Sequence, residues 1–160
     1  MPFPPRHRGC PVTIIETLKA EHKTVMAKLK ELESTTDRAE KTRTELRDEI
    51  EKALVGHAKG EEAVVYPAYA ARGNKEDLKS HAEAEVEHKA VEAVALPRLM
   101  AADVGSREFA GTSKVLMEFV DHHAKEEEKT IFPAMKKLFA KEELEQLDLD
   151  YKAWKAANGY

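Results

Sequence analysis

The chain has 160 residues, of which 35% are charged and 6% aromatic, and its net charge is -4. This length suits a single domain, and the low aromatic content favours a helical protein over a β-sandwich. No cluster of lysine and arginine marks a nucleic-acid surface, and no apolar run approaches the ~18 residues of a membrane span. We therefore expect a soluble, cytoplasmic protein with no nucleic-acid or membrane partner.

The segment 1–12 contains four prolines and is expected to form a disordered or extended tail. His7 lies in this tail, and so does Cys10, the only cysteine of the chain, which we expect to be an idle thiol. One cysteine cannot form an internal disulfide, so a reducing compartment is the simplest setting. The tail also lacks the apolar stretch of a signal peptide.

A first helix is expected to begin at Thr13, because Thr13 and Glu16 form a capping-box pattern. Its apolar residues recur at intervals of three and four, as on the buried side of a bundle helix. His22 occupies the middle of this apolar series. After a break near residues 34–37, a second helix is expected to run to about Ala71, ahead of a glycine stop at Gly73.

A third helix is expected over about 75–104 and a fourth from residue 107 to about Phe139, separated by Gly105 and Ser106. The periodicity of the fourth helix predicts that Phe119 is buried together with Leu116 and Val120. The last segment, residues 141–160, reads as a short helix packed on the outside of the other four.

The chain contains an internal repeat that relates position 57 to position 123. The stretch HAKGEEAVVYP at 57–67 matches HAKEEEKTIFP at 123–133, and EHK occurs at 21–23 and, by the same shift, at 87–89. Each half is then a helical hairpin, and two hairpins predict an all-α, up-down four-helix bundle with an extra C-terminal helix. Pro67 and Pro133 are expected to kink their helices at equivalent places.

The repeat places a polar set on the buried helix faces. Each half has one histidine on its first helix and a His-x-x-x-Glu on its second, a spacing that puts both side chains on one face. Six such groups buried without partners would each cost several kcal/mol. Imidazole and carboxylate donors suit iron, manganese or zinc, and each glutamate has two oxygens with which to bridge two ions. The predicted ligands are His22, His57, Glu61, His88, His123 and Glu127.

These motifs, in duplicate and in register over roughly residues 14–139, resemble those of the hemerythrin-like family, the HHE cation-binding domain. The resemblance implies that residues 13–140 form a hemerythrin-like bundle with a non-haem di-iron centre, its two iron ions linked by an oxo or hydroxo bridge. It assigns the ligand role to the same six residues. Oxygen-carrying members have a fifth histidine where this chain has Ala84, which argues against reversible oxygen carriage. Glu85 is a possible extra ligand in its place, and solvent is the other.

The remaining polar residues have plainer interpretations. His122 also has a glutamate four residues on, but the repeat register selects His123, so His122 is expected at the surface. His81 is expected to be a buried, hydrogen-bonded residue near the bundle end. Glu62 is a minor candidate for contacting a ligand histidine, whereas Glu128 is expected to be solvated. Tyr66 and its repeat partner Phe132 read as core residues.

Three function classes fit the predicted centre. The first is a protein that binds or senses dioxygen, nitric oxide or iron itself, and the second is an oxidoreductase that decomposes peroxide. The third, donation of iron to damaged iron–sulfur clusters, ranks last because repair members of the family carry an N-terminal pair of cysteines. The sequence does not separate the first two classes, because they share the same ligands.

Overall fold

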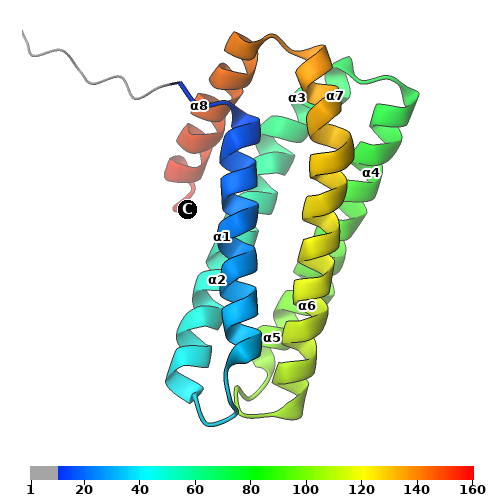
Figure 1. Cartoon of the computed structure of the whole chain (residues 1–160). Helices are drawn as coiled ribbons and strands as arrows, with labels where there is room; N and C mark the ends of the chain where they lie inside the picture. The colour runs from blue at the N-terminus through cyan, green and yellow to red at the C-terminus, as the bar shows by residue number, and fades with distance from the viewer. Residues whose placement is uncertain (1–10) are drawn as a thin grey trace, which may run out of the picture.

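The fold is that of a computed structural model, which describes residues 11–160. Positions 1–10 of the predicted tail, with His7 and Cys10, lie outside the described residues. Four long helical rods run antiparallel to their neighbours in an up-down bundle, and a fifth helix lies outside them (Figure 1). This is the predicted all-α architecture, with no strand within residues 11–160.

The first rod is a single helix, and the next three are each interrupted by one π-helical turn. The elements are α1 (Ile14–Ser34), α2 (Glu40–Gly60), η1 (Glu61–Val65), α3 (Tyr66–Arg72), α4 (Lys75–Ala90), η2 (Val91–Ala95), α5 (Leu96–Ala101), α6 (Arg107–Glu126), η3 (Glu127–Ile131), α7 (Phe132–Leu138) and α8 (Lys141–Ala157). The capping box of Thr13 and Glu16 is present at the start of α1. None of these helices is both long and apolar enough to cross a membrane.

Each π-helical turn is followed by a proline, which explains why the turn is there. Proline has no backbone N–H, and its ring clashes with the carbonyl four residues earlier. In η1 the helix widens by one residue ahead of Pro67, and the N–H of Tyr66 donates to the carbonyl of Glu61, five residues back. The turn ahead of Pro133 is equivalent. A third, before Pro97, was not predicted and has no counterpart in α1.

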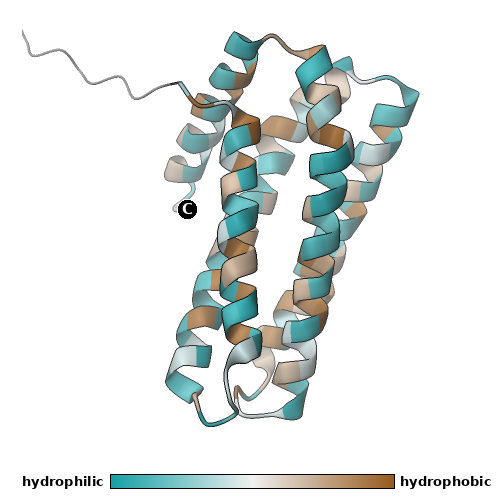
Figure 2. Cartoon of the chain, in the orientation of Figure 1, coloured by the Kyte–Doolittle hydropathy of each residue, from teal (hydrophilic) through white to brown (hydrophobic). Residues whose placement is uncertain are grey.

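The core consists of two apolar clusters at opposite ends of the bundle. One includes Leu18, Tyr66 and Met135 together with residues of α8, and the other includes Leu29, Ile50 and Leu116. Brown, apolar positions lie along the sides of the helices that face the interior (Figure 2). The hydrophobic effect thus holds both ends together, and the layer between the clusters is where the chain buries polar groups.

The structure corrects two details of the predicted fourth and third helices. Phe119 is 42% exposed, so its predicted burial is wrong, while Leu116 and Val120 do lie in the core. Ser113, one turn before Leu116, is buried instead and donates to the carbonyl of Phe109. The third rod ends at Ala101 rather than near residue 104.

Helix α8 packs on the first half of the chain, against α1, α2 and η1. Its Tyr151 ring lies over Gly60, where a side chain would overlap it, and Tyr160 lies over Gly56 in the same way. Two glycines one turn apart on α2 therefore make the groove that admits α8. The hydroxyl of Thr17 donates to Asp148 at 2.5 Å and fixes the helix from the α1 side.

Candidate metal centre

A layer of six buried polar side chains crosses the bundle between the two apolar clusters. All are at most 8% exposed. Each half of the chain contributes two histidines and one glutamate, from α1, α2 and η1 or from α4, α6 and η3. The structure thus brings together the whole predicted set: His22, His57, Glu61, His88, His123 and Glu127.

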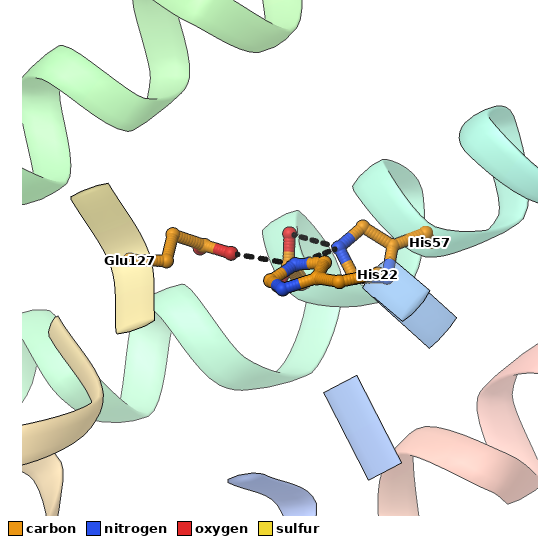
Figure 3. Close-up of side chains that lie close together, drawn as sticks. His22, His57 and Glu127 are labelled. Carbon is orange, nitrogen blue, oxygen red and sulfur yellow. Dashed lines mark hydrogen bonds and ion pairs between the residues drawn. The ribbon is translucent and has the colours of Figure 1, made fainter. Parts of the chain in front are cut away.

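The four histidines face one another in two pairs, one pair from each half. The Nε2 atoms of His22 and His57 are 3.2 Å apart, and those of His88 and His123 are 3.0 Å apart. Figure 3 shows the first pair with Glu127 reaching toward it from the other half. At this separation one nitrogen of each pair at most can carry a hydrogen. Neutral imidazole nitrogens are the commonest metal ligands in proteins, so two that converge on one point are typical of a metal site.

The two glutamates lie between the pairs. An oxygen of Glu61 is 3.3 Å from Nε2 of His57 and 3.3 Å from Nε2 of His88, one histidine of each pair. Glu127 makes the equivalent contacts to the other histidine of each pair, at 3.2 and 3.5 Å. The potential ligand atoms form two groups, and within each group all atoms lie within 4.8 Å of one another. Glu61 belongs to both groups. Each carboxylate thus lies between the two histidine pairs and contacts one histidine of each.

The carboxylates are not satisfied by the protein alone. Glu61 Oε1 and Glu127 Oε2 are buried and have no hydrogen-bond partner in the part of the chain that the structure describes. Burial, and then the negative charge of Glu127, raise the pKa of Glu61 well above its ordinary value. Burial opposes ionisation of Glu127 as well, but its 3.2 Å contact with His22 and the nearby histidine charges lower its pKa to about 2. A bound cation would satisfy both carboxylates, so the donor set fits a metal.

The far nitrogen of every histidine in the layer contacts a carboxylate. Nδ1 of His57 is 2.8 Å from Glu21 and Nδ1 of His123 is 2.7 Å from Glu87. The other two histidines contact Glu128, at 3.0 Å, and Glu62, at 3.2 Å. An Nδ1–H that donates to a carboxylate leaves the Nε2 lone pair directed at the centre, which is the tautomer that binds metal.

These four outer carboxylates follow the repeat, although only Glu62 was named as a candidate. Glu21 corresponds to Glu87 in the repeat, and Glu62 corresponds to Glu128. Glu128 was expected to be solvated. Its side chain is 38% exposed, but one carboxylate oxygen contacts Nδ1 of His22. The signal was present in the sequence, because both the EHK and the HxxxEE stretches repeat their glutamates in register.

Helix α8 supports one of the outer carboxylates. Glu21 accepts hydrogen bonds from Tyr151, at 2.6 Å, and from Lys155, at 2.9 Å. Burial raises the pKa of Glu21, but the hydrogen bond and charge of His57, with these two donors, lower it to about 2. Glu87, the repeat partner of Glu21, contacts His123 and the exposed His122, the latter at 3.0 Å, and has no contact with α8 of this kind. Its pKa is lowered mainly by the hydrogen bond with His123.

One hydroxyl breaks the two-fold symmetry of the layer. Tyr66 donates to Glu127 at 2.7 Å and lies 3.3 Å from Nε2 of His88, on whose ring it stacks. Burial, followed by the charges of the two glutamates, raises the pKa of Tyr66 well above its ordinary value, so the phenol keeps its proton. Its repeat partner Phe132 stacks on His22 and offers no polar atom. Tyr66 is buried as predicted, but its hydroxyl belongs to the centre.

The other named candidates lie outside the layer. Glu85 pairs with His81 at 3.6 Å, and its side chain is 44% exposed. His81 itself is half-buried rather than buried, with its ring edge-on to Tyr66. His122 is exposed, as the repeat register predicted. Ala84 is buried.

Comparison with known proteins places these motifs in a family. Residues 13–135 match the family model described as the hemerythrin HHE cation binding domain. The chain is also similar to a solved structure of a hemerythrin HHE cation binding domain-containing protein from Mycobacterium kansasii, with 25% identity and a TM-score of 0.77. That match covers 91% of this chain and 86% of the other. A search of curated proteins finds no match.

Proposed function

The chain belongs to the hemerythrin HHE cation-binding family, and we propose that its centre holds two iron ions and binds a small uncharged diatomic molecule, dioxygen or nitric oxide. His22 and His57 would bind one ion, and His88 and His123 the other. Glu61 and Glu127 would each bridge the two. Nitrogen and carboxylate donors support iron, although manganese and zinc accept the same donors. Bound iron would supply an open coordination position for a diatomic ligand, which suits sensing of the gas rather than oxygen storage.

The observation that carries the choice of ligand is an apolar pocket beside the histidines. It offers about 50 Å³, more than the ~10–15 Å³ that one water needs on the same measure. All four histidines line it, and the rest of its wall is mainly aliphatic, including Val91, Val120 and Leu96. Lys59, Glu87 and Glu92 also border the pocket, but its aliphatic part gives no hydrogen bonds to a polar or charged ligand, whereas a small uncharged gas loses nothing on entering it.

We expect the purified protein to show two properties, a defined iron content and a spectrum that responds to the gas. Metal analysis after loading with ferrous iron under nitrogen should give about two iron ions per chain. Addition of nitric oxide to this form should then change the visible absorption spectrum, and removal of the gas should restore it. One iron per chain would contradict the proposal, and so would a spectrum that responds neither to nitric oxide nor to dioxygen.

A pair of matched variants tests the role of the pocket separately from the role of the metal. Val91→Phe places a ring in the pocket, while Val94→Phe adds the same ring at a position that is 56% exposed. Val91→Phe should slow nitric oxide binding about 10-fold or more with iron content unchanged, because the ring occupies the path to the ions. Val94→Phe should bind at the wild-type rate, and equal rates for both variants would remove the pocket from the account.

Tyr66 favours one second candidate, the decomposition of peroxide. In that reaction one hydrogen peroxide is reduced to two waters while a second is oxidised to dioxygen, so protons must be delivered and removed at the centre. The Tyr66 hydroxyl, which keeps its proton 2.7 Å from Glu127, is placed to hydrogen-bond a bound peroxide and hold it for these proton transfers. If this reaction is the function, Tyr66→Phe should lower dioxygen release about 10-fold or more while iron content stays the same. If the iron-loaded wild-type protein releases dioxygen from peroxide more slowly than the same amount of free iron does, peroxide decomposition is excluded as the function.

A further inference from the structure

The internal repeat relates two grooves, one beside each half of the metal layer. In the first half, α8 fills the groove: Tyr151 covers Gly60, and Thr17 and Glu21 bond to the helix. The equivalent positions of the second half line a groove of about 320 Å³ that no element of residues 11–160 covers. Glu126 stands there in place of Gly60, and His122 in place of Gly56.

The open groove carries more polar and charged side chains than its counterpart. Glu83 replaces Thr17 and Ser80 replaces Ile14, so the wall carries the carboxylates of Glu83, Glu87 and Glu126. The imidazole of His122 adds a nitrogen donor, and among residues 11–160 no lysine or arginine lines this groove. Carboxylate and imidazole groups of this kind are weak, exchangeable ligands for divalent metal ions.

The groove leads to the buried layer. Glu127 forms part of its wall, is 1% exposed, and has an oxygen without a hydrogen-bond partner. Glu87 connects the two regions, because it contacts exposed His122 with one oxygen and buried His123 with the other. A cation in the groove would therefore meet solvent-facing donors first and an unsatisfied carboxylate at the inner end.

The other two hollows that reach the histidines are less suited to a cation. The apolar pocket has Lys59 in its wall, paired with Glu92 at 2.8 Å. A cleft between α1 and α2 reaches His57 but includes Lys155. A positive side chain repels an approaching metal ion, while a cleft lined with negative groups raises its local concentration.

We propose that the groove lined by Glu83, Glu87, His122 and Glu126 is the route by which divalent metal ions enter the centre. The inference rests on the proposed metal-binding function and adds the path by which the metal arrives. The lysines near its mouth do not close it. Lys79 pairs with Glu83, and Lys129 pairs with Glu126, each at 3.8 Å. Both are exposed pairs between residues of the same helical rod, and such pairs are weak and mobile.

Loading kinetics of the metal-free protein test the route. Cobalt(II) is added in a stopped-flow instrument, and binding is followed by its visible absorption. The double variant Glu83→Gln/Glu126→Gln should load about 10-fold more slowly than wild type at low salt, because two of the steering charges are gone. The final cobalt content should equal that of wild type, since neither residue belongs to the buried layer. Added salt should slow the wild type and have less effect on the variant.

Two single-charge controls separate this route from general effects. Glu108→Gln removes the same charge from an exposed site at the start of α6, and Glu92→Gln removes it beside the apolar pocket. Both should load at the wild-type rate. A double variant as fast as Glu108→Gln, or a Glu92→Gln variant as slow as the double variant, would overturn the proposed route. Wild-type protein that takes up no cobalt would instead contradict the metal centre itself.

Discussion

The groove beside the first half of the metal layer is closed by α8, whereas the equivalent groove beside the second half is open. The proposed ligands on either side are the same, because His57 and Glu61 are repeated as His123 and Glu127. What changed is the outer wall, where two glycines that admit α8 correspond to His122 and Glu126. Duplication has thus kept the buried chemistry and let the surfaces around it diverge.

The difference also reaches the ligands through their outer carboxylates. Glu21 is held by Tyr151 and Lys155 of α8 and orients His57. Glu87 orients His123 with only exposed His122 as a further neighbour. We therefore expect the first-half ligands to be the more rigid pair, and the second-half pair to be the more accessible.

The largest expected effect tests what the halves share. Glu127→Ala removes a carboxylate that contacts one histidine of each pair, so metal content should fall from about two ions per chain to one or fewer. Inductively coupled plasma mass spectrometry of protein loaded with iron measures this directly. Retention of two ions would show that Glu127 does not bridge.

The next effect breaks the closed groove. Gly60→Ala places a methyl group where it overlaps the Tyr151 ring, so α8 must shift, at a cost of about 1–3 kcal/mol in unfolding free energy. Urea unfolding measures the loss. Trp154, the only tryptophan of the chain, lies in α8 and reports the shift by its fluorescence.

The matched change in the open groove is Glu126→Ala, at the position equivalent to Gly60. Glu126 is exposed, and its ion pair with Lys129 stays within the same helical rod. This variant should therefore alter the free energy of unfolding by less than about 0.5 kcal/mol. Equal losses for the two variants would mean that the grooves do not differ as the structure indicates.

A smaller effect concerns the support that α8 gives to one ligand. Tyr151→Phe removes one hydrogen bond to Glu21 while keeping the ring on Gly60. Loss of a group that contacts a ligand histidine typically weakens metal binding about 10- to 100-fold. Tyr151 acts one step further out, through Glu21, so we expect about 10-fold or less, at one of the two sites only. Cobalt titration should then show two unequal steps, and a uniform weakening of both would contradict the assignment.

The smallest effect is expected for His122→Ala. His122 is exposed and contacts only Glu87, so metal content should stay at about two ions per chain, while His123→Ala, one residue on, should lower it. The two neighbours share the same helix and the same i+4 glutamate spacing. The reverse pattern would show that the repeat register selects the wrong histidine.

The sequence predicted the bundle and the six-residue layer because the repeat fixes both the helix faces and the register. Of the outer carboxylates it named only Glu62 as a candidate, since Glu21 and Glu128, taken singly, resemble any solvated glutamate. The placement of Phe119 failed because a helix packed on one side buries a narrower stripe than its apolar content suggests. The docking site of α8 was visible only as a departure from the repeat, at Gly56 and Gly60, which becomes meaningful once the ring of Tyr151 is seen above it.

The central claim, that the two halves supply one metal site each and share two bridging carboxylates, is tested most directly by X-ray anomalous scattering from crystals of the iron-loaded protein. The account predicts two peaks in the buried layer, one within bonding distance of Nε2 of His22 and His57 and the other of His88 and His123. Both should also lie within bonding distance of Glu61 and Glu127. A single peak, or two peaks that share no carboxylate, would contradict it.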